Sequence, residues 1–252
     1  MLLGLLPVSS GRVALFARPP SRATRERLGY VPQTLGLYAD LTVAENLQFA
    51  ARAFGSPPVT ALPDELAEVQ ERLVGDIGLG LQRQLAFLAA LGHSPSLLVL
   101  DEPTSGVDPL ARSRLWDTIH EQADSGVGVL VTTHYMQEAD QCDRLVIMVA
   151  GRVAAAGTVR EIVRGRTAIQ VDTDSWEQAF RALTDAGTPA LLAGRSVRVP
   201  DTSVEEVHRV LDRAGLSARI TAVTSTLAET LITLDQAASG NGSGTDRASS
   251  GN

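Results

Sequence analysis

Residues 97–109 read LLVLDEPTSGVDP and decide the fold class. Four apolar residues are followed at once by Asp101 and Glu102, and Pro103 then ends the strand. Such an apolar run, bounded by residues that break regular structure, is typical of a strand buried on both faces of a parallel sheet. Carboxylates at the C-terminal end of such a strand lie where α/β folds bind ligands. An acidic loop without function is the alternative for the carboxylate pair taken alone.

The composition fits a globular protein and limits the kinds of partner. The chain has 252 residues, of which 44% are apolar and 20% are charged, and its net charge is −7. That charge argues against a nucleic-acid partner, which would need a basic surface. Every basic residue is Arg, because the sequence contains no Lys. Because Cys142 is the only cysteine, an internal disulfide is excluded. A membrane span is not predicted, since the sequence has no run of about twenty apolar residues.

The order of predicted elements indicates an α/β sheet followed by a smaller domain. Strands and helices alternate from residue 97 to residue 149, as in a parallel sheet. Upstream we expect the end of a helix at 1–6, strands at 12–16 and 28–31, and helices at 43–54 and 64–73.

Near residue 165 the pattern changes to βαββαβ, the order of a ferredoxin-like or split βαβ unit. We therefore predict an α/β domain at 1–165 and a small α+β domain at 166–236. The Gly/Ser-rich tail, 237–252, is expected to be disordered.

Three strings resemble the nucleotide-binding cassettes of ABC-type ATPases. LLVLDEPTSGVDP is similar to their Walker B and D-loop segment. LGYVPQTLGLYADLTVAENL, residues 28–47, resembles the Q-loop region of bacterial exporter cassettes. VLVTTHYMQEADQCDRLVIMVAGRVAAAGT, residues 129–158, resembles the switch region. The strings occur in the family's order, which implies a P-loop NTPase-like fold that binds ATP and Mg²⁺.

The resemblance assigns roles to individual residues. Asp101 would hold Mg²⁺ through water and Glu102 would polarise the attacking water. Gln33 would reach both the metal and that water, His134 would complete the pocket for the γ-phosphate, and Asp108 would act across a dimer interface. For Gln33 or His134 in isolation, an ordinary polar residue at a strand end is the alternative.

Two motifs of the family depart from its pattern here. No GxxGxGK[ST] loop, the Walker A motif, occurs in the chain, so the phosphate cradle at a helix N-terminus has no counterpart. We interpret the chain as a cassette that starts after this loop. The signature motif falls on 77–84, IGLGLQRQ, where Gly78 replaces its Ser and Gly80 is retained. The usual Gln-Arg order reads Arg83-Gln84, and a plain turn before a helix is the alternative.

The resemblance implies an ATP-binding subunit of a bacterial ABC exporter, at the cytoplasmic face of the cell membrane. Its partners would be a transmembrane permease subunit and a second cassette, in a homo- or heterodimer. Without Walker A we expect weak turnover by the chain alone. A non-catalytic pseudo-ATPase that regulates an intact cassette is the main alternative. A soluble ABC protein that works on ribosomes or DNA is disfavoured by the acidic charge.

Overall fold

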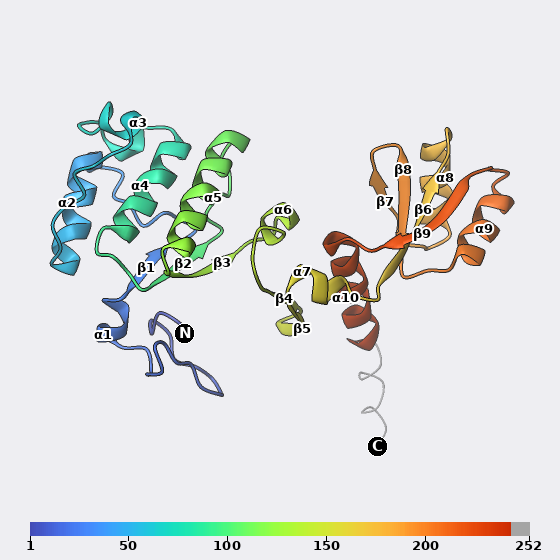
Figure 1. Cartoon of the computed structure of the whole chain (residues 1–252), viewed down its shortest axis with the longest axis horizontal. Coiled ribbons are helices and arrows are strands. Elements are labelled where there is room, and N and C mark those ends of the chain that lie inside the picture. Colours follow the sequence, from blue (N-terminus) through green and yellow to red (C-terminus); the bar gives the residue numbers. More distant parts are fainter. Residues whose placement is uncertain (243–252) are drawn as a thin grey trace, which may run out of the picture. The chain divides into compact units, whose positions relative to one another are not determined.

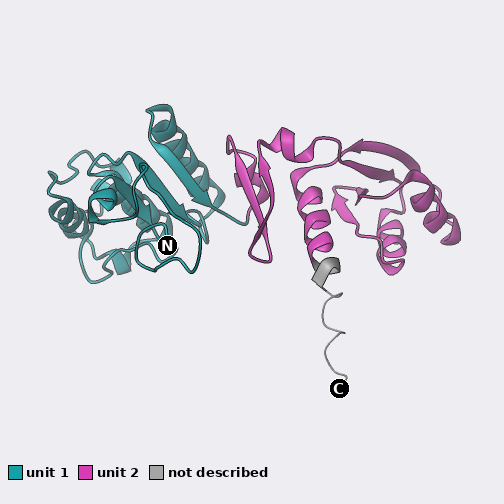
Figure 2. Cartoon of the chain, turned by 90° about the horizontal axis from the view of Figure 1, so that it is seen from below, with its two compact units in different colours: residues 1–134 teal, residues 135–252 magenta. Residues whose placement is uncertain are grey.

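The computed structural model describes residues 1–242 and divides into two compact units (Figure 2). The first unit comprises Met1–His134 and the second Tyr135–Asn252. We describe each unit by itself. No helix within the described part of the chain is both long enough and apolar enough to span a bilayer.

The first unit is built on a three-stranded parallel sheet. Strands β1 (Leu28–Val31), β2 (Leu97–Asp101) and β3 (Gly128–Thr132) pair in that order. Leu97 lies opposite Leu28 on one side and Gly128 on the other, so all three strands run in register. The predicted parallel α/β sheet is thereby confirmed, and the carboxyl ends of the strands meet at one edge.

Helices cover one face of this sheet and the N-terminal segment lies on the other (Figure 1). The larger helices are α2 (Val43–Phe54), α4 (Leu79–Leu91) and α5 (Pro109–Asp124). Shorter ones are α1 (Arg22–Arg25), α3 (Asp64–Ala67) and the 3₁₀ turn Val74–Asp76. The capping box at Thr42 and Glu45 starts α2 as predicted, since each side chain bonds the other's backbone N–H.

Three upstream predictions were wrong. Residues 1–6 form turns rather than a helix end, with Gly4 in the left-handed region at φ +69°. Residues 12–16 form a single bridge, Leu15 with Arg18, because Phe16 and Ala17 turn the chain back at positive φ. The helix predicted at 64–73 ends at Ala67, after which the chain turns back to bond the start of α2.

The second unit combines a hairpin with a four-stranded antiparallel sheet. The hairpin, β4 (Leu145–Val149) and β5 (Arg152–Gly157), lies between α6 (Met136–Ala139) and α7 (Val159–Val163) in the chain. The sheet has the order β7-β8-β6-β9, with β6 at Thr167–Asp172, β7 at Leu191–Ala193, β8 at Ser196–Pro200 and β9 at Arg219–Thr224. Helices α8 (Trp176–Asp185) and α9 (Val204–Arg213) complete the predicted βαββαβ order.

A last helix, α10 (Leu227–Gly242), follows β9. It extends six positions into 237–252, so 237–242 are helical where disorder was expected, and the remainder of that prediction lies outside the described residues. The helix begins from a capping box, in which Thr226 and Glu229 each bond the other's backbone N–H.

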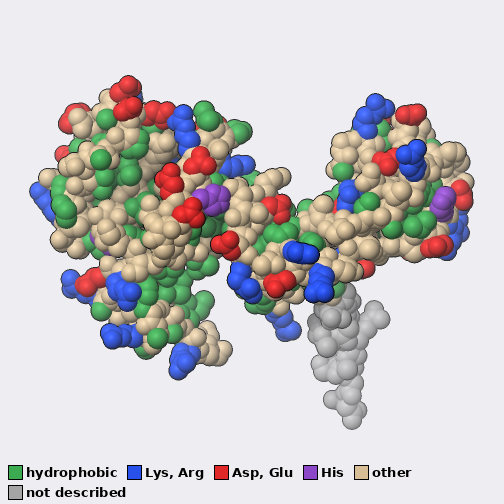
Figure 3. Space-filling view, viewed as in Figure 1, with side chains coloured by type: hydrophobic (Ala, Val, Ile, Leu, Met, Phe, Trp, Pro, Cys, Tyr) green, Lys and Arg blue, Asp and Glu red, His purple; other side chains and the backbone are tan. Residues whose placement is uncertain are grey.

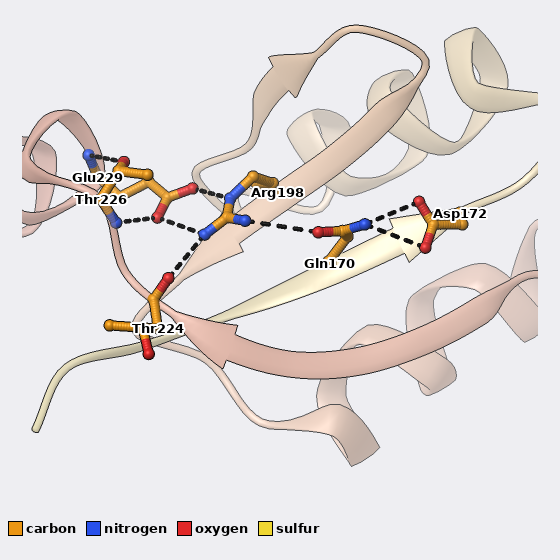
Figure 4. Close-up of polar contacts among 6 residues, drawn as sticks. All are labelled: Gln170, Asp172, Arg198, Thr224, Thr226 and Glu229. Carbon is orange, nitrogen blue, oxygen red and sulfur yellow. Dashed lines mark hydrogen bonds and ion pairs between the residues drawn. The ribbon is translucent and has the colours of Figure 1, made fainter.

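The start of α10 is fixed to the sheet by a buried ion pair (Figure 4). The Arg198 guanidinium donates to both carboxylate oxygens of Glu229 and to the Thr224 carbonyl oxygen. Glu229 is 2% exposed and also accepts from the Thr226 amide as part of the capping box. Arg198 reaches Gln170, which donates to Asp172, so one chain of hydrogen bonds crosses two strands.

Candidate functional site

The carboxyl edge of the parallel sheet brings three predicted site residues together. The Gln33 Nε2 donates to Glu102 Oε2 at 3.3 Å, and His134 Nδ1 lies 3.5 Å from Glu102 Oε1. Gln33 follows β1, Glu102 follows β2 and His134 follows β3. The parallel register brings the ends of the three strands, and with them these side chains, to the same edge of the sheet. On the face of the first unit that is visible in Figure 3, a histidine lies beside acidic side chains.

The Glu102 carboxylate is therefore bracketed, with one neighbour at each oxygen. Its side chain is 30% exposed and that of His134 is 58% exposed, so the site is open to solvent. A carboxylate held in this way can accept a proton from a water molecule placed beside it.

Asp101 is held by Thr132, a residue that the motif strings did not single out. Thr132 Oγ1 donates to Asp101 Oδ1 at 2.5 Å and accepts from the Glu102 amide at 3.2 Å. Burial, and then the charge of Asp101, raise the pKa of the neighbouring Tyr30. The parallel register could have revealed Thr132, because the residue opposite Asp101 on the next strand must lie beside it.

The oxygen atoms at this edge suit Mg²⁺, a hard ion that binds few protein ligands and keeps several waters. Asp101 offers a carboxylate, and Gln33 uses its amide nitrogen toward Glu102, which leaves its oxygen for a metal. Among the described residues there is no cluster of three or more His, Cys, Asp or Glu that could hold a metal ion. The oxygens of Asp101 and Gln33 are of the type that would suit a magnesium ion.

Asp108 lies at the start of α5 and caps that helix. Its Oδ1 accepts from the amides of Leu110 and Ala111 at 2.9 and 3.0 Å. These bonds, chiefly that from Ala111, lower the pKa of Asp108, and Pro109 occupies the first helical position. The structure thus shows a capping role for Asp108, and its predicted role across a dimer interface is untested.

The glycines of the signature segment lie at the start of α4. Gly78 is the N-cap, with φ −63° and ψ 151°, and no heavy atom lies within 4 Å of the place where its Cβ would be. A Cβ on Gly80 would lie 3.4 Å from the Ala111 side chain of α5. Position 78 therefore has room for the Ser that the family carries, while position 80 lies close to a neighbouring helix.

Comparison with known proteins finds similar ATP-binding proteins of ABC transporters. A family profile described as "AAA domain, putative AbiEii toxin, Type IV TA system" matches residues 49–139. The Nod factor export ATP-binding protein I of Burkholderia pseudomallei (strain 1710b) is 38% identical over 233 residues, which cover 86% of this chain and 76% of that protein. The probable multidrug ABC transporter ATP-binding protein YbhF of Escherichia coli (strain K12) is 34% identical over 191 residues. That match covers 71% of this chain but spans only 33% of the length of YbhF.

Solved structures agree with these relatives. An ATP-binding subunit of an ABC transporter superposes with a TM-score of 0.57 at 29% identity, covering 65% of this chain and 73% of that one. CbiO1 from Clostridium perfringens, part of the ABC transporter complex cbiONQ, superposes with a TM-score of 0.51 at 26% identity, covering 64% and 71%. The α/β fold with its parallel sheet is thus that of ABC ATPase subunits. The chain belongs to the family of ATP-binding proteins of export-type ABC transporters.

Proposed function

We propose that this chain binds Mg²⁺-ATP at the carboxyl edge of the β1–β3 sheet and couples the nucleotide to export by a membrane permease. The observation that supports this most directly is the Glu102 carboxylate, which contacts Gln33 on one side and His134 on the other. Phosphoryl transfer to water needs a positioned water and charge neutralisation rather than covalent catalysis. The side chains of Gln33, Glu102 and His134, at the ends of three strands, would position that water.

The proposal assigns a role to each residue of the site. Glu102 accepts a proton from the attacking water, and Gln33 orients both that water and the Glu102 carboxylate. His134 donates a hydrogen bond to the γ-phosphate, and Asp101, fixed by Thr132, holds a water of the metal shell. When bound there, Mg²⁺ would neutralise charge on the phosphates. The backbone at Gly78 and Gly80, at the start of α4, would approach the phosphates of a nucleotide shared with a second cassette. Asp108, which caps α5, would act across the interface with that cassette.

The partners belong to the same proposal. We infer a transmembrane permease subunit, which places the chain at the inner face of the cell membrane, and a second cassette. CbiO1, to which this chain is similar, is itself part of a transporter complex. The division into a cassette at 1–165 and a ferredoxin-like C-terminal domain at 166–236 is also part of the proposal.

We further propose that these 252 residues hydrolyse ATP slowly on their own, because none of them is a Lys that could reach the phosphates. Gly78, in place of Ser, favours a second candidate, a non-catalytic partner of an intact cassette. Copurification with such a cassette, with turnover unchanged by Glu102→Gln in this chain, would support that second candidate.

Binding of ATP with and without Mg²⁺ tests the proposal. Asp101→Asn removes the charge that attracts the metal shell, and changes to such outer-shell partners typically weaken metal binding by about 10–100-fold. We expect Mg²⁺ to strengthen ATP binding by the parent chain, and Asp101→Asn to remove that gain, in isothermal titration calorimetry. Asp117→Asn, an exposed carboxylate of α5, is the matched control and should behave as the parent. Equal Mg²⁺ dependence in Asp101→Asn and the parent would contradict the proposed metal site.

A further inference from the structure

Arg83 is a charged side chain buried inside the first unit. It lies on α4 with 4% of its surface exposed, and its Nη2 donates to the Ser105 carbonyl oxygen at 3.1 Å. Its Nε and Nη1 have no hydrogen-bond partner in the described part of the chain. Burial lowers the pKa of Arg83, while the negative charge of Glu102 opposes that shift. A cation is thus enclosed within electrostatic reach of the candidate catalytic carboxylate.

The loop that Arg83 contacts has a strained backbone. Glu102 adopts φ +46°, a left-handed conformation that non-glycine residues rarely take and keep only when their surroundings hold them there. On one side the Glu102 amide bonds Thr132, and within the loop the Ser105 amide bonds the Glu102 carbonyl oxygen. On the other side, α4 supplies the bond from Arg83.

Packing adds a second contact between α4 and this loop. A Cβ on Gly106 would lie 3.1 Å from Leu79 Cδ2, so the loop lies against the first turn of α4. That turn begins at Gly78, the N-cap in the signature segment. The start of α4 and the loop of Glu102 are therefore joined by a hydrogen bond and by close packing.

A charge at position 83 is costly for stability. Buried charges without full pairing are usually less favourable than an apolar side chain of similar size. The neighbouring Gln84 also has a buried side-chain oxygen, Oε1, without a partner among the described residues. Arg83 and Gln84 thus both bury polar atoms that have no partner among the described residues, which residues selected for core packing alone would avoid.

We propose that Arg83 is a positioning residue that holds loop 102–106, and with it the Glu102 carboxylate, against the start of α4. Its hydrogen bond fixes the far end of the loop, and its charge attracts the carboxylate at the near end. A movement of the signature segment would then displace Glu102 directly. The importance of that displacement for turnover rests on the proposed function of Glu102.

Hydrogen–deuterium exchange, measured by mass spectrometry on the full chain without nucleotide, tests this role. Arg83→Met keeps an unbranched side chain in the core but removes the charge and the donors. We expect peptides covering 102–107 to exchange about tenfold faster in Arg83→Met, while α2 and the sheet of the second unit exchange as in the parent. The melting temperature should stay the same or rise, because an incompletely paired buried charge is lost.

Two further variants sharpen the result. Arg83→Lys retains the charge and a donor and should restore slow exchange in 102–107. Arg114→Met removes an exposed Arg of α5 that pairs with Glu65, and should leave the loop unchanged. Unchanged exchange in Arg83→Met would overturn the proposal. So would faster exchange throughout the unit with a lower melting temperature, since that pattern indicates a merely structural role.

The assay contains no nucleotide, so its result is independent of ATP binding. A loosened loop in Arg83→Met together with no ATP binding by the parent would support the positioning role and contradict the proposed function. A rigid loop in Arg83→Met together with Mg²⁺-dependent ATP binding by the parent would contradict the positioning role and support the proposed function.

Discussion

Fusing a segment that carries a GxxGxGK[ST] loop ahead of Met1 is expected to raise the rate of ATP hydrolysis, and Glu102→Gln in the fusion should lower that rate by about 100-fold or more, the usual contribution of a general base. The loop adds backbone N–H groups at a helix N-terminus and a Lys, which together bind the phosphates. Gln33 and His134 already contact the Glu102 carboxylate, which is the proposed general base. Glutamine keeps the shape of that side chain but cannot accept the proton.

Phosphate release measured at saturating Mg²⁺-ATP checks this expectation. Glu121→Gln, which changes an exposed carboxylate of α5, is the control and should leave the rate of the fusion unchanged. A fusion as active with Glu102→Gln as without it would show that Glu102 is not the general base. Equal rates for the unfused and fused chains would show that the missing Lys does not limit turnover.

Arg198→Met is expected to destabilise the second unit by about 3–5 kcal/mol, the usual effect of removing one partner of a buried ion pair. Glu229 is 2% exposed and would keep its charge without the guanidinium. Adding Glu229→Gln should recover much of the loss, because glutamine removes the unpaired charge and can still complete the capping box with Thr226. Arg195→Met, at an exposed pair with Asp174, is the control and should change stability by less than about 1 kcal/mol.

Urea unfolding followed by the fluorescence of Trp176 measures this effect, since Trp176 packs on the core of the second unit. A Trp116→Phe background removes the signal of the first unit. Equal stability of Arg198→Met and Arg195→Met would contradict the role of the ion pair. So would a double variant as unstable as Arg198→Met alone.

The same pair predicts a pH dependence. Burial by itself would raise the pKa of Glu229, but hydrogen bonds from Arg198 and the Thr226 amide outweigh it, and the pKa is lowered. A carboxyl with a lowered pKa in the folded state stabilises the fold above its unfolded pKa, about 4.3 for Glu. That contribution is lost as the pH falls below this value, so the difference between the parent and the double variant should shrink in acid.

The central strands could be predicted because local and long-range signals agree there. The apolar run before Asp101 and the alternation of strands and helices after it are sufficient for a parallel sheet, and that prediction is confirmed. The helix at Thr42 was equally predictable, since its capping box acts within four residues. The N-terminal residues were not, because apolar Leu2 and Leu3 pack on the sheet from turns that no local pattern specifies.

The sequence predicted the residues of the candidate site better than the residues that hold them in place. The motif strings indicated Gln33, Glu102 and His134, and the structure brings these three side chains together. Thr132 was missed, and Arg83 was noted only as part of the degenerate signature motif. The importance of both residues depends on which atoms of Asp101 and Ser105 they reach in three dimensions. The catalytic roles remain predictions.

Paramagnetic broadening by Mn²⁺-ATP tests most directly whether the three strand ends form one nucleotide site. In backbone amide NMR spectra of the full chain, we expect the signals of Val31, Gln33, 101–102 and 132–134 to broaden together when Mn²⁺ and ATP are both added. Asp101→Asn should prevent this broadening. Broadening confined to other segments, or equal broadening in Asp101→Asn, would contradict a metal–nucleotide site at the carboxyl edge of the sheet.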